Sequence, residues 1–215
     1  MTERLSYCCG ICTGVFRIGC YTIYRKICCK PPPPPKPEFA VICIGLTKAG
    51  KSTLLALLAG ESTEVEPTKG FSIKALQFSD CIINVKEIGG ADNVRPYWHH
   101  YYHGAQGVIF VLDSSSSDED LQKVESELSN ALVNPQLRNV PCLILATYQD
   151  VPGAKTGEQL TDVLELNKNC DGRQWHLQMC SKADTKSVRA GFMQFNQLLL
   201  GPSPDREAAG DYNRL

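Results

Sequence analysis

The chain has little net charge, and it lacks an apolar run near its N-terminus that could cross a membrane. Its 215 residues carry a formal charge of −1 at pH 7, so no excess of basic side chains indicates nucleic acid as a partner. The apolar stretch before residue 30 is interrupted by Arg17 and is too short for a spanning helix. No small-residue cleavage site follows it, and Thr2 stands where N-myristoylation needs Gly. A signal peptide and an N-terminal myristoyl group are therefore not expected.

Cysteine, by contrast, is abundant, with 11 residues in two groups. The first group lies before the prolines at 31–35 and consists of Cys8, Cys9, Cys12, Cys20, Cys28 and Cys29. The second is scattered over the rest of the chain and consists of Cys43, Cys81, Cys142, Cys170 and Cys180. A disulfide framework is typical of short secreted chains, which this is not. We therefore expect buried thiols in a reducing cytosol for the second group and a special role for the first.

Residues 1–30 combine the first group of cysteines with basic and aromatic side chains. The basic residues, which outnumber the single acid Glu3, are Arg4, Arg17, Arg25, Lys26 and Lys30. Such a segment is typical of reversible S-palmitoylation, in which several acyl chains with basic residues anchor a protein stably. We predict that these cysteines are acylated and anchor the chain to the cytoplasmic face of a membrane, the Golgi or the plasma membrane. Two alternatives stay open: zinc binding, although the spacing supplies no clean paired C-x-x-C, and a tail without a membrane role.

Prolines at 31–35 and 37 mark a boundary after this segment. A run of this kind forms a stiff polyproline II spacer, and it could also be a ligand for an aromatic-lined groove. We therefore expect an anchor segment over 1–30, a linker over 31–37, a globular domain over 38–200 and a disordered tail over 201–215.

One stretch fits a phosphate-binding loop at every fixed position. It reads Gly45-Leu46-Thr47-Lys48-Ala49-Gly50-Lys51-Ser52 and is followed by Thr53. A β-branched apolar run over 39–44 precedes it, and helix formers over 53–59 follow it up to Gly60. In such a context backbone amides close around phosphate oxygens and the helix N-terminus adds its positive dipole. Lys51 is expected to reach the outer phosphates and the Ser52 hydroxyl to ligate Mg²⁺, whereas the alternative is a chance glycine turn before a helix.

Strand and helix signals alternate along the domain. The apolar segments expected as strands are 39–44, 71–78, 81–88, 107–112, 142–146 and 175–179, with a hairpin at Ser79-Asp80. Helices are expected at 53–59, at 118–133 with Ser117 as its cap, and at 188–200. The core face of the last helix is expected to carry Phe192, Phe195, Leu198 and Leu199. This alternation predicts an α/β fold with a six-stranded, mostly parallel sheet and helices on both faces.

Three further motifs stand where a GTPase needs them: one precedes the second expected strand, one ends the third and one follows the fifth. They are Glu66-Pro67-Thr68-Lys69-Gly70-Phe71, Glu87-Ile88-Gly89-Gly90 and Ala146-Thr147-Tyr148-Gln149-Asp150. Together with Arg95-Pro96-Tyr97-Trp98 and the run from Gln106 to Ser114, they resemble the ADP-ribosylation-factor family of small GTPases over residues 39–200. The resemblance implies the small-GTPase form of the P-loop NTPase fold, with GTP or GDP and Mg²⁺ as cofactors.

The resemblance also implies roles for single residues. Thr68 matches the switch I threonine whose hydroxyl ligates Mg²⁺, and Gly90 matches the switch II glycine whose N–H bonds the γ-phosphate. Asp150 matches the carboxylate that accepts hydrogen bonds from the guanine edge. Ser181, followed by Lys182, falls where a backbone amide meets the guanine oxygen. The order of two loops would then depend on one phosphate group.

The chain departs from the family pattern in switch II. Glu87 stands for an aspartate that steadies Mg²⁺ through water, so the charge is kept and the reach is longer. Ala91 replaces the glutamine that orients the attacking water, and a methyl group cannot aim a water molecule. Arg95 has a structural place in the pattern, with catalysis as the lesser alternative. A packing or solvent-facing role is favoured over water positioning for His99, His100 and His103. Intrinsic hydrolysis is therefore expected to be very slow, so whether the chain acts as an enzyme stays open.

The base-reading motif of the family, Asn-Lys-x-Asp, is also altered. Thr147 offers only a short hydroxyl in place of the asparagine that bridges the base and the phosphate loop. Tyr148 is expected to stack on the purine in place of the lysine. Because Asp150 is kept, we expect a preference for guanine over adenine, with weaker affinity than in ordinary members.

These features support three hypotheses. The first is a membrane-anchored GTP-binding switch in membrane trafficking or signalling, whose loops are read by an effector protein and acted on by an exchange factor. An aromatic cluster suits such an interface, and it comprises Tyr97, Trp98, Tyr101 and Tyr102. The alternative is that Trp98 and Tyr101 pack against the sheet. The second is a pseudo-GTPase that binds membrane-protein partners whatever its nucleotide state. The third, a phosphotransferase, lacks an identifiable acceptor site or lid.

Overall fold

The computed structural model describes residue 19 and residues 35–64 and 66–201. The chain divides into two compact units, residues 1–36 and 37–215, and nearly all described residues belong to the second. The first group of cysteines, predicted to carry lipid, lies outside the described residues, as do most of the proline linker and the tail from residue 202. Among the described residues, no helix has the length and apolar character needed to cross a bilayer.

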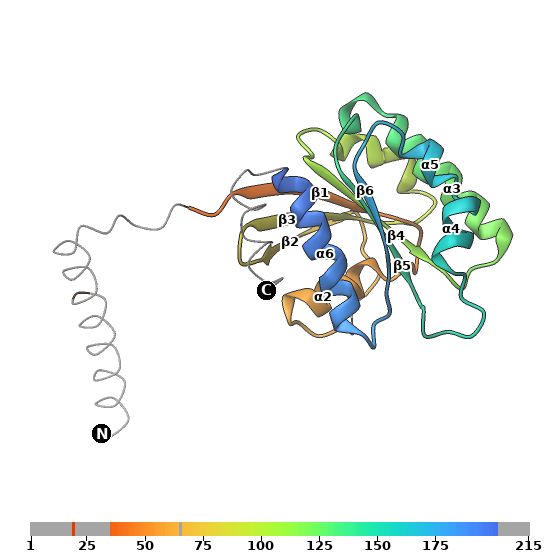
Figure 1. The fold of residues 1–215 in the computed structure, drawn as a ribbon, viewed down its shortest axis with the longest axis horizontal. Coiled ribbons are helices and arrows are strands. Elements are labelled where there is room, and N and C mark those ends of the chain that lie inside the picture. Colours follow the sequence, from red (N-terminus) through yellow and green to blue (C-terminus); the bar gives the residue numbers. More distant parts are fainter. Residues whose placement is uncertain (1–18, 20–34, 65, 202–215) are drawn as a thin grey trace, which may run out of the picture. The chain divides into compact units, whose positions relative to one another are not determined.

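The second unit is built around one six-stranded sheet (Figure 1). Its strands are β1 (Glu38–Ile44), β2 (Phe71–Gln77), β3 (Ile82–Ile88), β4 (Gly107–Asp113), β5 (Cys142–Thr147) and β6 (Trp175–Met179). They lie in the order β2-β3-β1-β4-β5-β6, and every neighbouring pair is parallel except the antiparallel hairpin of β2 and β3. The predicted strands, hairpin and fold class are therefore confirmed.

Helices cover both faces of this sheet, as Figure 1 shows. On one face lie α2 (Lys51–Ala59) and α6 (Thr185–Leu200), and on the other lie α3 (Asp118–Val133), α4 (Gly157–Val163) and α5 (Leu166–Asn169). Short 3₁₀ helices, η1 (Arg95–Tyr101) and η2 (Pro135–Leu137), lie in the connections. Because both faces are covered, the central strands β4 and β5 are apolar almost throughout.

Alternate strand residues divide the core into two clusters. Phe110 and Ile144 pack with the helices α3, α4 and α5, whereas Val111 and Leu145 pack with α2 and α6. The cysteines of the second group are all buried and free, as predicted for buried thiols, and they are Cys43, Cys81, Cys142, Cys170 and Cys180.

Two helices begin earlier than predicted, α2 at Lys51 and α6, and two others, α4 and α5, were not predicted. Helix α6 begins at Thr185, three residues before the predicted start, because the Asp184 carboxylate accepts hydrogen bonds from the amides of Lys186 and Ser187. Helix α4 was not predicted, although Thr156 and Gln159 cap it reciprocally.

The core face of α6 also differs in part from the prediction. Phe192 and Phe195 are buried, as predicted, but Leu198 and Leu199 are only half-buried, and of these two Leu199 packs against the core. Val188, one helical turn before Phe192, completes the buried stripe. The face therefore lies nearer the N-terminus of the helix than expected.

Candidate functional site

The segment from Gly45 to Ser52 joins β1 to α2, and α2 begins at Lys51. Two of its residues adopt left-handed backbone conformations, Lys48 at φ 62° and Gly50 at φ 88°. Gly50 caps the N-terminus of α2 without a side-chain hydrogen bond, so the first amides of the helix stay directed out of the turn. This is the strand, tight turn and helix that a phosphate-binding loop requires.

The side chain of Lys51 extends from the first turn of α2 back across the loop. Its Nζ donates hydrogen bonds to the carbonyl oxygens of Gly45 at 2.9 Å and Leu46 at 2.8 Å, and its side chain is buried. Burial lowers the pKa of Lys51, and the nearby Cys43 and Glu87 side chains oppose that shift. The lysine thus places an amine at the centre of the loop.

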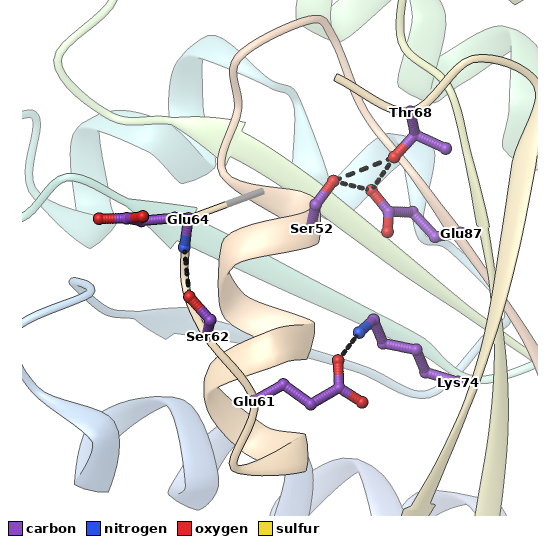
Figure 2. Close-up of polar contacts among 7 residues, drawn as sticks. All are labelled: Ser52, Glu61, Ser62, Glu64, Thr68, Lys74 and Glu87. Carbon is purple, nitrogen blue, oxygen red and sulfur yellow. Dashed lines mark hydrogen bonds and ion pairs between the residues drawn. The ribbon is translucent and has the colours of Figure 1, made fainter. Parts of the chain in front are cut away.

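A cluster of three oxygen-bearing side chains lies beside the first turn of α2 (Figure 2). The Ser52 and Thr68 hydroxyl oxygens are 3.1 Å apart, and both hydroxyls hydrogen-bond the same carboxylate oxygen of Glu87, Thr68 at 3.1 Å. Glu87 is 1% exposed. Since both hydroxyl hydrogens can be given to Glu87, the oxygen lone pairs stay available to a hard cation such as Mg²⁺, which prefers oxygen ligands. The residues present therefore fit a magnesium site.

Within the described part of the chain, no group of three or more His, Cys, Asp or Glu side chains is placed so that it could hold a metal ion.

The glycines after β3 bring switch II against both neighbouring loops. A side-chain carbon at Gly90 would lie 2.3 Å from the carbonyl oxygen of Gly45, and one at Gly89 would lie 2.6 Å from the carbonyl oxygen of Thr68. The Gly89 amide donates to Gly70 at 2.8 Å, and its carbonyl accepts from the indole N–H of Trp98 at 2.9 Å. Only glycine permits this close backbone approach.

A cavity of about 320 Å³ lies between these segments. Its lining comes from the phosphate loop (Thr47, Lys48 and 50–53), from residues 66–68, from Glu87 and residues 89–91, and from Tyr148. The structure thus brings together Lys51, Ser52, Thr68, Gly90 and Ala91, which the sequence motifs singled out separately. The size is at the lower end for pockets that hold small molecules.

Thr147, which the sequence suggested had lost the bridging role of asparagine, contacts the phosphate loop directly. Its hydroxyl lies 3.0 Å from the carbonyl oxygen of Ala49 and 2.9 Å from that of Leu112, and the residue is 3% exposed. A hydroxyl carries one hydrogen, so it donates to these two acceptors in a shared or alternating way. The end of β5 is therefore tied to the loop between β1 and α2.

Of the other residues predicted to read the base, Tyr148 alone lines the cavity. Tyr148 has φ 60°, and its phenolic O–H donates to the carbonyl of Lys48 at 3.1 Å, so the ring lies against the phosphate loop. Asp150 and Lys182 are exposed and do not line the cavity, whereas Ser181 is buried. The backbone N–H of Gln149 donates to the carbonyl oxygen of Cys180 at 3.3 Å. This hydrogen bond holds the segment of Asp150 beside the segment of Ser181.

Gln149 is a supporting residue that sequence reasoning missed. Its side-chain amide donates to the Ser114 hydroxyl at 2.7 Å and to the Lys155 carbonyl at 3.2 Å, and the Ser114 hydroxyl donates to the Thr147 carbonyl. Gln149 occupies the variable position of the four-residue motif, which gave no signal for this role.

The arginine and the histidines in and just after η1 occupy structural and surface positions. Arg95 forms ion pairs with Asp92 at 2.9 Å and Glu127 at 3.2 Å, so its guanidinium is engaged with α3. The histidines of this region are all exposed, as the favoured interpretation predicted, and they are His99, His100 and His103.

Comparison with known proteins agrees with this geometry. A sequence model of the ADP-ribosylation factor family matches residues 30–199. The ADP-ribosylation factor-like protein 15 of Mus musculus and that of Homo sapiens are each 49% identical over 188 residues, which cover 87% of this chain and 92% of theirs. A solved structure of the Arl6 BBS3 small GTPase from Trypanosoma brucei, with the bound nucleotide analogue GppNp, matches with a TM-score of 0.70 at 26% identity over 75% of this chain and 97% of that one.

Proposed function

The chain belongs to the ADP-ribosylation factor family, and from this premise we propose that it is a membrane-associated molecular switch that binds GTP and GDP with Mg²⁺. The family resemblance found in the sequence is thereby confirmed. The observation that carries the proposal is the cavity in which Lys51, Ser52, Thr68 and Gly90 meet, although they come from three separate segments. A relative of known structure carries a nucleotide analogue.

Each residue of the cavity has a task that its position allows. Lys51 would donate to the outer phosphates of a bound nucleotide, and the first amides of α2 would add the positive end of the helix dipole. Ser52 and Thr68 offer hydroxyl oxygens to Mg²⁺, and Gly90 brings a backbone amide to the γ-phosphate end. Magnesium, when bound, neutralises part of the phosphate charge.

Hydrolysis is proposed to be weak or absent because of Ala91. This residue lines the cavity, so its methyl group occupies the place from which a longer polar side chain would hold the attacking water. Arg95 supplies no compensating charge, since its guanidinium is paired with Asp92 and Glu127. Intrinsic turnover is expected at or below about 10⁻⁴ s⁻¹, the scale of a small GTPase acting alone.

Guanine selectivity is assigned to the exposed Asp150 beside the segment of Ser181. An aspartate aimed at a purine edge favours guanine, because an unpaired carboxylate facing adenine loses its hydrogen bonds. Tyr148, whose ring lies against Lys48, supplies apolar surface near the same end.

A partner protein is proposed to read the apolar surface beside the cavity, and an exchange factor to act on the same loops. Phe71 and Ile73 of β2 are 52% and 60% exposed, Tyr97 of η1 is 58% exposed, and the Phe71 and Tyr101 rings lie 5.5 Å apart. Exposed aromatic side chains of this kind supply much of the contact energy in protein interfaces.

Not all of the predicted aromatic cluster is available to such a partner. The alternative in which Trp98 and Tyr101 pack against the sheet is borne out: Trp98 is 2% exposed, and the half-buried Tyr101 packs against the same core cluster. Tyr102, at 3% exposed, is buried as well. The surface offered to a partner is therefore Tyr97 and the exposed residues of β2, with only the outer part of the Tyr101 ring.

Membrane association is proposed to come from acylation of the N-terminal cysteines at the cytoplasmic face of the Golgi or the plasma membrane. The support is compositional: cysteines interleaved with basic and apolar residues in one segment. A role in trafficking or signalling follows from placing a switch at a membrane surface.

Hydrogen exchange measured in parallel with hydrolysis tests the switch. We expect the amides of residues 90–102 to exchange more slowly with a non-hydrolysable GTP analogue than with GDP, because the γ-phosphate holds the Gly90 segment. Single-turnover hydrolysis should stay at the slow rate given above. Equal exchange in the two states would reject the switch and favour a partner-binding module that ignores its nucleotide.

A further inference from the structure

The buried carboxylate of Glu87 joins two segments that belong to different parts of the chain. One of its oxygens accepts hydrogen bonds from Ser52, in the first turn of α2, and from Thr68, in the loop before β2 (Figure 2). The Ser52 and Thr68 hydroxyls also contact each other at 3.1 Å. These contacts join the end of β3, the first turn of α2 and the loop before β2 directly through side chains.

We propose that Glu87 is a positioning residue that holds Thr68 against the phosphate loop directly, so that closure of the loop before β2 does not depend on Mg²⁺. The inference deepens the proposed function, because it rests on that loop being part of the nucleotide switch. Mg²⁺ would then bind to a loop that Glu87 already holds closed.

The length of the Glu87 side chain is what makes these contacts. The Thr68 hydroxyl lies 3.1 Å from the carboxylate oxygen, at the long end of the range for a hydroxyl donor. An aspartate is shorter by one carbon–carbon bond of about 1.5 Å, which would place its oxygen beyond the ~3.5 Å at which a hydrogen bond is lost. An aspartate would therefore need an intervening ion or water, whereas glutamate reaches the hydroxyls itself.

Burial makes the Glu87 carboxylate depend on these contacts. Glu87 is 1% exposed, and a buried carboxylate is costly unless it accepts hydrogen bonds. The nearby amine of Lys51 gives its hydrogen bonds to the carbonyls of Gly45 and Leu46, so the two hydroxyls are the donors that satisfy Glu87. Hydrogen bonds to a charged acceptor are the stronger kind.

The backbone transmits this contact to the end of the β2–β3 hairpin. Gly89, two residues after Glu87, approaches the carbonyl of Thr68 so closely that a side-chain carbon would lie 2.6 Å from it. The Gly89 amide donates to Gly70 at 2.8 Å, two residues after Thr68. Protection of the Gly89 amide from exchange therefore reports whether the loop before β2, at Gly70, stays paired with the end of β3.

The test compares Glu87→Asp with the wild-type full chain, by hydrogen exchange at Gly89 in magnesium and in EDTA. In the wild type, protection of the Gly89 amide should change by less than about twofold when EDTA removes magnesium. In Glu87→Asp, removal of magnesium should lower this protection by roughly 10²-fold, the combined effect of two hydrogen bonds to a carboxylate. Glu61→Gln is the matched control. It breaks the nearby exposed ion pair with Lys74, also drawn in Figure 2, and should leave Gly89 exchange unchanged.

Thr68→Val supplies a second variant that removes the donor and keeps the side-chain shape, and it should also lose protection. Equal sensitivity of the wild type and Glu87→Asp to EDTA would overturn the inference, and so would full protection in both variants. Nucleotide content is measured on the same samples. A chain that takes up no nucleotide refutes the proposed function, while the Gly89 comparison still decides the role of Glu87.

Discussion

Replacing Thr147 with valine tests whether the end of β5 supports the phosphate loop. Valine keeps the shape of threonine but removes the hydroxyl that lies 3.0 Å from the Ala49 carbonyl and 2.9 Å from the Leu112 carbonyl. The site is buried, so a carbonyl that loses its donor pays a desolvation penalty of about 1–3 kcal/mol. That penalty corresponds to roughly 5- to 150-fold in an equilibrium constant.

We expect this loss to be seen in two measurements. Urea unfolding should show lower stability, and titration with a fluorescent guanine nucleotide should show affinity weaker by about fivefold or more, because Ala49 precedes the residues that contact phosphate. The matched control is Thr156→Val, which removes the cap of α4 at the exposed surface and should cost about 1 kcal/mol of stability without changing nucleotide affinity. If Thr147→Val weakens nucleotide binding no more than Thr156→Val does, the supporting role of Thr147 is wrong.

Three other substitutions test separate parts of the account. Lys51→Ala should weaken nucleotide binding by about 10²-fold or more in calorimetry with the fold retained, because charge-assisted bonds to phosphate are lost; unchanged affinity would contradict the phosphate-loop assignment. Ala91→Gln should raise single-turnover hydrolysis about tenfold or more by restoring a side chain that aims water, and an unchanged rate would show that water positioning is not the missing element. Serine at all the N-terminal cysteines should move the chain from the membrane fraction to the supernatant, whereas no shift would reject the anchor; they are Cys8, Cys9, Cys12, Cys20, Cys28 and Cys29.

The sheet was predictable because its strands are short apolar runs with clear boundaries. The runs that became β4 and β5 are buried on both faces, so their residues are apolar without alternation, and each is one residue longer than predicted. Helix α3 matched its prediction at both ends, since Ser117 caps it and its apolar residues recur at helical spacing.

The helices that were missed or begun too late differ in what their sequences signalled. In α4 Leu160 is the one buried residue of seven, so no repeat could be read, although the capping pair of Thr156 and Gln159 was present in the sequence. The early start of α6 was signalled by Asp184, which caps the helix ahead of its first apolar residue.

The candidate site was predictable as a set of motifs but not as a set of contacts. Short motifs carry the phosphate loop and both switch segments, and the fold brings them to one cavity. The hydrogen bond from Thr147 to Ala49 joins residues 98 apart, and the reach of Glu87 to Thr68 depends on side-chain length as well as backbone position. Neither contact has a local signature, because both depend on how distant segments pack.

Equilibrium titration of the full chain with GTP, GDP and ATP in magnesium tests the central claim most directly. If Lys51 and the first turn of α2 bind the phosphates and Asp150 reads the base, the chain should take up GTP and GDP saturably at one site and bind ATP at least about 10²-fold more weakly. Absence of saturable uptake of either guanine nucleotide would contradict the account.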